Sequence, residues 1–230
     1  MNSYLIDSVF FGAVISLAAY EAGLLIKRKF RLAILNPLLI ATVCVMAALT
    51  LLKIEYKHYN EGAKYISYLL TPATVCLAVP LYQQLELLRR NLKAVAVGIT
   101  SGVLASLASV FLLAKLFSLT HEQYVTLLPK SITTAIGMGV SEELGGISTI
   151  TVAVIIVTGI LGNVIAEIVC RLFRIEEPIA KGLALGTASH AIGTAKAMEL
   201  GEVEGAMSSL AIAVAGLLTV GGASLFANLM

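Results

Sequence analysis

The sequence predicts an all-α polytopic membrane protein of about six full spans plus two short re-entrant or interrupted segments. Hydrophobic residues make up 58% of the 230-residue chain and charged residues only 13%, and the mean hydropathy is +0.92. Soluble domains are about 45–50% apolar. The sequence also contains several uncharged runs of roughly 20 residues, the length that a helix needs to cross the hydrocarbon core of a bilayer. We therefore expect one integral membrane domain over residues 1–230.

The expected spans follow one another from the N-terminus. The first run, Leu5–Ile26, carries Asp7 and Glu21, and basic residues follow it, which is typical of an uncleaved span with its N-terminus outside. The other runs are uncharged. They are Leu32–Leu52, Tyr65–Leu85, Ala94–Ala114, Gly145–Ala166 and Gly205–Met230.

Two shorter uncharged segments, Ser131–Ser141 and Gly182–Ala195, decide the topology. If every segment crosses, eight Lys and Arg residues lie on each side, whereas re-entrant short segments put eleven of the 16 inside. The bias of basic residues toward the cytoplasm favours the re-entrant arrangement, and eight crossings are the alternative. The inside residues are then Lys27, Arg28, Lys29, Arg31, Arg89, Arg90, Lys93, Arg171, Arg174, Lys181 and Lys196.

The chain also resembles itself. VAVGITSGVL from Val95 matches VAVIIVTGIL from Val152, a shift of 57 residues (152 − 95), and the same shift places Pro72 on Pro129. In the re-entrant arrangement the matching spans run in opposite directions, as in the inverted repeats of secondary transporters. The similarity predicts an inverted repeat, with chance likeness between apolar helices as the alternative.

The composition argues against several function classes. A net charge of +2 gives no basic surface for nucleic acid. The three cysteines lack metal-ligand spacing, and the sequence contains no recognisable set of nucleophile, base and orienting residue. We therefore expect no enzymatic activity, no cofactor and no metal.

Function is expected where helix breakers interrupt apolar runs, because backbone without helical hydrogen bonds at membrane depth must be buried in protein or face water. Three such clusters are Asn36-Pro37, Thr71–Pro80 and Pro129–Gly146. A simple kink is the alternative, and the better interpretation of Asn36-Pro37 alone. The candidate solute-binding residues, including those after Gly186, are Asn36, Thr71, Thr74, Lys130, Ser131, Thr133, Thr134, Thr187, Ser189, His190 and Thr194.

The Pro129 segment is expected to bind an anion. Pro129 is placed to start a helix, with Lys130 and three hydroxyl residues in the first turn. Unpaired N–H groups, the positive end of the helix dipole and a lysine all favour negative charge. The alternative is that Lys130 extends to the membrane interface.

The stretch Gly186–Ala197 is expected to supply a second polar lining. Gly182, Gly186, His190 and Thr194 recur every four residues and would share one helix face. His190 is a candidate proton shuttle, with a structural role as the alternative. The carboxylates that follow, Glu199, Glu202 and Glu204, are expected to end this segment in water.

These stretches resemble the LrgB/CidB family of bacterial membrane proteins over most of the chain. The resemblance rests on LNPLLIA (35–41), PKSITTAIGMGVSEELGGI (129–147), GILGNV (159–164) and PIAKGLALGTASHAIGTAKAMELGEVEGAMSSLA (178–211). A departure is Ala135, where members usually carry proline, and it bears on how sharply this copy breaks its helix.

The resemblance implies two functions. Family members are described as antiholin-like or holin-like regulators of murein hydrolase activity and cell lysis, acting with a small LrgA/CidA-type membrane partner. Relatives, including a plastid glycolate/glycerate transporter, move small monocarboxylates such as pyruvate, glycolate and glycerate. The broken, hydroxyl-lined segments favour transport of a small anionic solute, with lysis regulation as the alternative. We expect a homo-oligomer, multi-pass in the bilayer of the bacterial plasma membrane.

Overall fold

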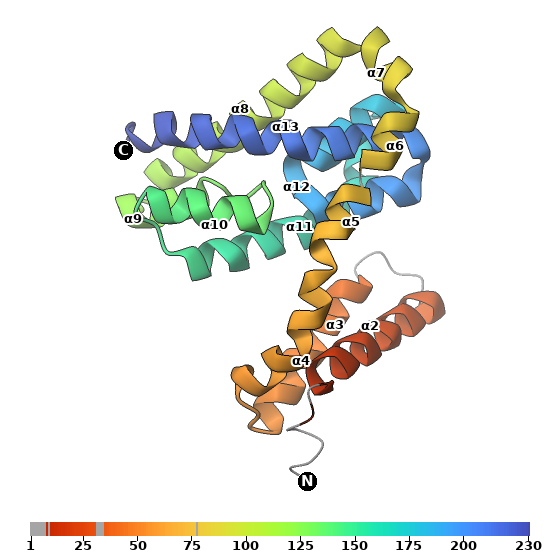
Figure 1. Cartoon of the computed structure of the whole chain (residues 1–230). Helices are drawn as coiled ribbons and strands as arrows, with labels where there is room; N and C mark the ends of the chain where they lie inside the picture. The colour runs from red at the N-terminus through yellow and green to blue at the C-terminus, as the bar shows by residue number, and fades with distance from the viewer. Residues whose placement is uncertain (1–7, 9, 31–34, 77) are drawn as a thin grey trace. The chain divides into compact units, whose positions relative to one another are not determined.

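The computed structural model describes residues 8, 10–30, 35–76 and 78–230, without the side chains at 70, 71 and 74. Within that part of the chain every regular element is a helix, as predicted. The helices form two compact units, unit 1 (Met1–Cys76) and unit 2 (Leu77–Met230) (Figure 1). Unit 1 consists of α2 (Phe11–Phe30), α3 (Pro37–Leu51), α4 (Tyr56–Tyr68) and α5 (Leu70–Cys76).

Asn36 and Pro37 begin α3. The side chain of Asn36 accepts hydrogen bonds from the N–H groups of Leu38 at 2.8 Å and Leu39 at 3.3 Å. Proline suits the first helical position because its missing N–H would have had no partner there. The expectation that this motif interrupts a span is therefore wrong, since it starts the helix.

Unit 2 contains the three helices of the described chain that are long and apolar enough to cross a membrane: α8 (Leu92–Leu116), α11 (Ser148–Leu172) and α13 (Glu202–Ala227). Two short helices, α6 (Ala78–Gln83) and α7 (Leu85–Arg90), precede α8. Between the long helices lie α9 (His121–Leu127), α10 (Thr134–Glu143) and α12 (Pro178–Leu200).

The expected count of six spans is not confirmed. Three of the predicted runs correspond to α8, α11 and α13, and α3 is a shorter apolar helix. The run Tyr65–Leu85 is not one span, because its described residues are divided among several short helices from α4 to α7. Pro72 and Pro80 lie in this stretch, and proline interrupts the hydrogen bonding of a helix interior.

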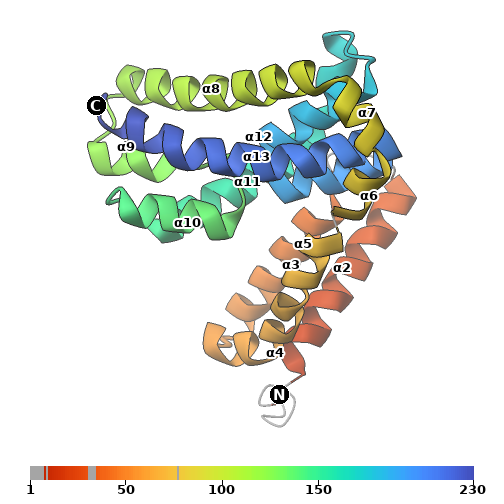
Figure 2. The same cartoon turned by 45° about the horizontal axis from the view of Figure 1, so that its top comes forward.

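The long helices of unit 2 alternate in direction (Figure 2). Tyr124, just after α8, donates its hydroxyl to the carbonyl of Phe226 at 2.9 Å, so α8 and α13 finish at the same end. The N–H of Ile147 donates to the hydroxyl of Thr126 at 2.9 Å, so α11 starts there. We name this the C-terminal end of unit 2.

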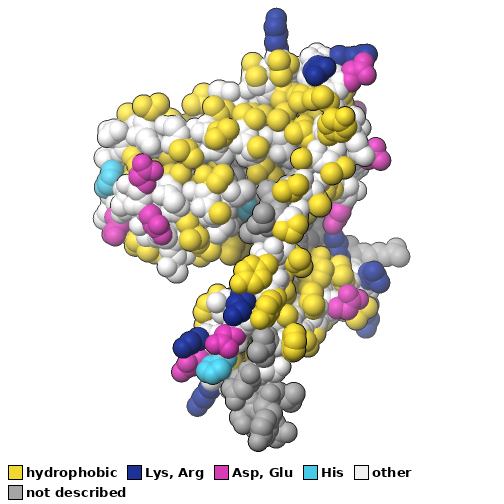
Figure 3. Space-filling model, viewed as in Figure 1, with side chains coloured by type: hydrophobic (Ala, Val, Ile, Leu, Met, Phe, Trp, Pro, Cys, Tyr) yellow, Lys and Arg dark blue, Asp and Glu magenta, His cyan; other side chains and the backbone are white. Residues whose placement is uncertain are grey.

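The opposite end of unit 2 is named the basic end, because it holds the start of α8 and the finish of α11 with their cations. These are Arg89, Arg90, Lys93, Arg171, Arg174 and Lys181. Figure 3 shows charged side chains gathered toward the ends of unit 2, with mostly hydrophobic surface between them. Exposed leucines such as Leu104, Leu161 and Leu217 belong to that middle surface. An apolar belt between charged ends is what a bilayer requires.

Helices α9 and α10 form a hairpin that rises from the C-terminal end. The hydroxyl of Thr151, near the start of α11, lies 2.9 Å from the carbonyl of Thr126 in α9 and 2.7 Å from the hydroxyl of Ser141 in α10. The tip, residues 128–133, is a turn, and the helix begins at Thr134. The expectation that Pro129 starts a helix is wrong, because the chain reverses direction there.

Helix α12 is also broken. Ser189 (φ −134°, ψ 15°) and His190 (φ 42°, ψ −138°) are non-helical and separate a first arm, residues 178–188, from a second arm, residues 191–200. A side chain at Gly193 would come within 2.6 Å of the carbonyl of Leu185, so the arms meet closely beside the break.

The two arms of α12 double back along α13. A side chain at Gly186 would contact the carbonyl of Ser208 at 2.5 Å, and the hydroxyl of Thr194 lies 2.7 Å from that of Ser208. A straight helix would separate residues 186 and 194 by about 12 Å. The predicted single face of Gly182, Gly186, His190 and Thr194 is therefore wrong, since the break redirects its second half.

The structure repeats with the 57-residue shift. Helices α8 and α11 have 25 residues each, and adding 57 to the bounds of α10 gives 191–200, the second arm of α12. The same shift relates Gly102 to Gly159 (102 + 57 = 159). Gly102 lies against Thr187, just before the break in α12, and Gly159 lies against His190, within the break. The two hairpins thus start from opposite ends of unit 2.

Candidate functional site

A groove of about 810 Å³ runs between α8 and the first arm of α12. Both hairpins border it, the first through Lys130 and Ser131 at its tip and the second through Thr187 and Ala188 beside its break. The tips reach mid-length of the long helices, because Ser131 lies 2.9 Å from Ser106 in α8. Three predicted residues, Lys130, Ser131 and Thr187, therefore share one cavity.

Lys130 is the cation of this groove. Its Nζ donates to the hydroxyls of Ser131 at 3.0 Å and Ser106 at 3.3 Å, and these hydroxyls lie 2.9 Å apart. Within the described chain no carboxylate pairs with it. An ammonium has three hydrogens, so one remains for a solute. Of the two hydroxyl hydrogens, one forms the hydrogen bond between Ser106 and Ser131, and the other is also available to a solute.

The serines of α8 are candidates that the sequence interpretation missed. Ser101, Ser106 and Ser109 line the groove. A signal was present in the sequence, because small residues recur on one face of α8. They are Ala94, Gly98, Gly102 and Ser106. A side chain at Gly102 would come within 2.9 Å of the hydroxyl of Thr187, so the small face permits the close approach of α12.

His190 anchors the break in α12 and does not line the groove. Its Nε2 lies 2.9 Å from the carbonyl of Ile155, and the residue is 3% exposed. A side chain at Gly159 would come within 2.7 Å of the imidazole ring. A φ of 42° favours glycine, and a non-glycine residue held there costs about 1–3 kcal/mol unless its surroundings fix it. The hydrogen bond to Ile155 and the packing on Gly159, both in α11, hold His190 in this conformation.

We expect His190→Ala to reduce the amount of folded protein more than His190→Gln. Alanine removes the hydrogen bond from the imidazole to the carbonyl of Ile155, which contributes about 0.5–1.5 kcal/mol, and also removes the ring that packs on Gly159, whereas the glutamine amide can replace the hydrogen bond. Size-exclusion profiles after mild detergent extraction measure the difference. A proton shuttle predicts the reverse pattern, in which His190→Ala folds normally and flattens the pH dependence of uptake.

The remaining predicted residues lie apart from the groove. Thr194 bonds to Ser208, and Ser189 is 2% exposed against Gly162. Thr133 is the N-cap of α10 without a side-chain cap bond, and Thr134 begins that helix. Asn36 caps α3 in unit 1, and the side chains of Thr71 and Thr74 lie outside the described residues.

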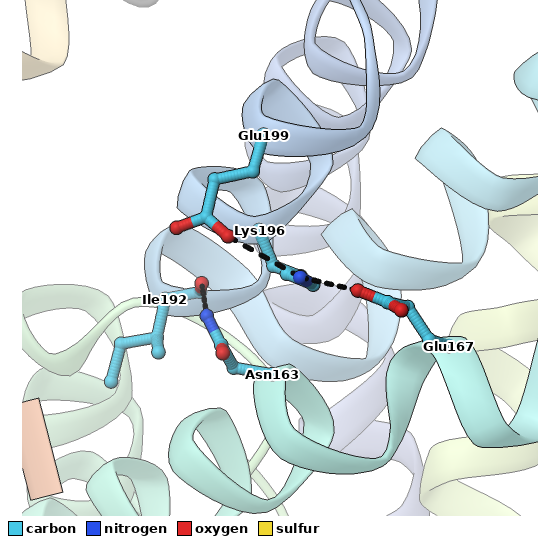
Figure 4. Close-up of polar contacts among 5 residues, drawn as sticks. All are labelled: Asn163, Glu167, Ile192, Lys196 and Glu199. Atoms are coloured by element: carbon cyan, nitrogen blue, oxygen red, sulfur yellow. Dashed lines mark hydrogen bonds and ion pairs between the residues drawn. The ribbon is translucent and has the colours of Figure 1, made fainter. Parts of the chain in front are cut away.

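A second polar cluster joins α12 to α11 toward the basic end (Figure 4). Lys196 bonds to Glu167 at 2.6 Å and to Glu199 at 3.3 Å. Asn163, one turn earlier in α11, donates to the carbonyl of Ile192 at 3.1 Å.

The acidic residues after α12 were expected to end this segment in water. Glu199 and Glu202 are exposed, whereas Glu204 is only 9% exposed. For Glu204 the expectation is therefore wrong, because the arms of α12 pack against the first turn of α13. A side chain at Gly182 would overlap the carbonyl of Glu204, and one at Gly205 would come within 2.9 Å of Met198.

Long apolar helices around two opposed, broken hairpins define a helical membrane protein. The chain belongs to the LrgB-like family, whose model matches residues 16–229. It is 40% identical over 212 residues to the antiholin-like protein LrgB of Bacillus cereus (strain B4264), covering 92% of each chain. The same identity and coverage hold for the antiholin-like protein LrgB of Bacillus anthracis (strain A0248). No solved structure matches the chain.

Proposed function

We propose that this protein transports a small monocarboxylate such as pyruvate, glycolate or glycerate. The observation that carries the proposal is Lys130, which Ser106 and Ser131 hold in the groove and which pairs with no carboxylate of the described residues, although Glu177 also lines the groove. The available ammonium and hydroxyl hydrogens can each bond one oxygen of a carboxylate. In a partly apolar groove, such charge-assisted bonds are stronger than in water.

The two hairpins support transport rather than a permanently open pore. In this proposal they are re-entrant segments that enter the membrane from opposite faces and bring their tips to the solute near mid-depth. A groove of about 810 Å³ falls in the range of small-molecule sites and exceeds the size of pyruvate. The groove must therefore narrow around such a solute, as alternating access requires.

Uptake of radiolabelled pyruvate and glycolate into proteoliposomes tests the proposal. We expect saturable uptake that unlabelled monocarboxylates inhibit and that neutral solutes of similar size do not. Empty liposomes and liposomes with heat-denatured protein are the controls. Non-saturating flux of unrelated solutes would contradict a transporter and indicate a pore.

The second candidate is an antiholin-like regulator of murein hydrolase activity and cell lysis, acting with a small LrgA/CidA-type partner. The names of the relatives favour this function over transport. Co-purification with such a partner, and a lysis assay in cells lacking this protein, test it. Restored lysis control by a variant that no longer transports would favour the second candidate over the first.

The basic end is expected to face the cytoplasm, because basic residues favour that side. Single cysteines at Arg90 and Arg174, in a background without Cys44, Cys76 and Cys170, should be shielded from impermeant thiol reagents in intact cells. A cysteine at Lys29 in unit 1 should be shielded as well. Labelling of the Arg174 position from outside would contradict the re-entrant arrangement, since α9–α10 would then cross the membrane.

A further inference from the structure

The second arm of α12 is attached to α11 by two polar contacts that repeat with helical spacing. Asn163 pairs with the carbonyl of Ile192, and four residues later on both helices Glu167 pairs with Lys196 (Figure 4). Four residues are about one helical turn, so both contacts lie on the facing sides of the two helices. The ion pair is the contact nearer the basic end.

The residues next to this ion pair in the sequence belong to a small apolar cluster between α11 and α12. Ala166, Leu185 and Ala197 are buried together at 6%, 5% and 0% exposure. The side chain of Lys196 is 14% exposed, whereas that of Glu167 is 52% exposed. Lys196 is thus mostly buried, and Glu167 faces the solvent side.

A second cavity, of about 310 Å³, lies on that side. Two carboxylates, Glu167 and Glu176, line it together with three cations that make no ion pair within the described chain, Arg171, Arg174 and Lys181. The groove at Lys130 lies against other residues of the first arm, such as Ala184 and Thr187. The hairpin α12 therefore separates a charged opening at the basic end, with three cations and two carboxylates, from the groove.

We propose that the Lys196–Glu167 ion pair is a gate. It holds the second arm of α12 against α11 and closes the basic end of unit 2. The inference rests on the transport proposal, because a gate is useful only to a transporter. A small anion gathered by the three unpaired cations competes with Glu167 for Lys196. Loss of the pair frees the second arm, and the opening then connects to the hairpin tips.

A buried reporter tests the gate without any transport assay. In a background with Cys44, Cys76 and Cys170 replaced by serine, Ala197→Cys places one thiol in the apolar cluster. In inside-out vesicles, Lys196→Met and Glu167→Gln should each raise its rate of reaction with an impermeant thiol reagent by about 1.5- to fivefold. The charge exchange Lys196→Glu with Glu167→Lys should return the rate toward its original value.

Lys93→Met is the matched control, because it removes an exposed lysine at the same end away from the pair. Equal amounts of folded protein by size-exclusion exclude unfolding as the cause, and the charge exchange provides a second test if Lys196→Met folds poorly. An unchanged labelling rate in Lys196→Met and Glu167→Gln would overturn the gate. This result is independent of whether any monocarboxylate is transported.

A reversible cross-link between α11 and α12 tests the gate in a transport assay. Glu167→Cys with Lys196→Cys, joined by a short methanethiosulfonate cross-linker, should stop uptake, and reduction should restore it. The single-cysteine variants should keep their uptake after the same treatment. Full uptake by the cross-linked protein would overturn the gate, whereas absence of uptake in the reduced and the unmodified protein would count against the transport proposal.

Discussion

Lys130→Met is expected to weaken monocarboxylate binding by about tenfold to a hundredfold. Methionine keeps most of the length of the side chain but removes a charged hydrogen bond, which is worth about 1.5–3 kcal/mol. The neighbouring hydroxyls of Ser106 and Ser131 can still bond to each other, so the local fold should persist. Uptake in proteoliposomes should show the loss in KM, and Lys130→Arg should retain part of the affinity.

The control for this prediction is Lys115→Met. Lys115 lies in the last turn of α8, with its Nζ 4.6 Å from the ring centre of Phe111, and it is exposed outside the groove. Equal charge is removed in both variants, so a general electrostatic effect on uptake would appear in both. A normal KM for Lys130→Met at equal folded protein would mean that Lys130 does not bind the solute.

Ser131→Ala is expected to weaken uptake less than Lys130→Met. It removes one neutral acceptor from the ammonium and the hydroxyl that is shared with Ser106. Neutral hydrogen bonds contribute about 0.5–1.5 kcal/mol, or a change in affinity of about two- to tenfold. Thr133→Ala, outside the groove at the N-cap of α10, should leave KM unchanged. Equal effects of the two variants would contradict the placement of the solute.

The long helices of unit 2 could be predicted from hydropathy, but the break in α12 could not. No proline marks it, and Ser189 and His190 are ordinary helix residues. The break depends on tertiary packing, since Gly159 and Gly162 of α11 leave the space that these two side chains fill. Sequence spacing alone therefore placed residues on either side of the break on one continuous face.

The candidate site could be predicted only in part, because its complete lining also depends on tertiary packing. Lys130, Ser131 and Thr187 stand out as polar residues in apolar segments, and the structure brings them to one groove. The serines of α8 did not stand out, because hydroxyls within a long span can bond to the preceding turn and often only aid packing. Their role depends on which face of α8 meets the hairpins, which only the three-dimensional arrangement shows.

Gly162→Ala is expected to cause a large loss of folded protein. A methyl group there would overlap Oγ of Ser189 and lie 2.7 Å from its Cβ. Overpacking of a tight interior costs about 1–3 kcal/mol. Gly221→Ala is the matched control, because it is also in a helix and a side chain there meets nothing within 4 Å. Both variants gain the same helix propensity, so their difference in thermal unfolding reports the packing of the break.

Ser189→Gly should rescue Gly162→Ala, because it removes both atoms that the new methyl group meets. The double variant should recover most of the folded protein, and the coupling between two contacting residues should be about 0.5–3 kcal/mol. If the two substitutions are merely additive, Ser189 does not pack on Gly162, and the break lies elsewhere. The groove would then lose its second wall, because the break in α12 places Thr187 against α8 in the groove that Lys130 also lines.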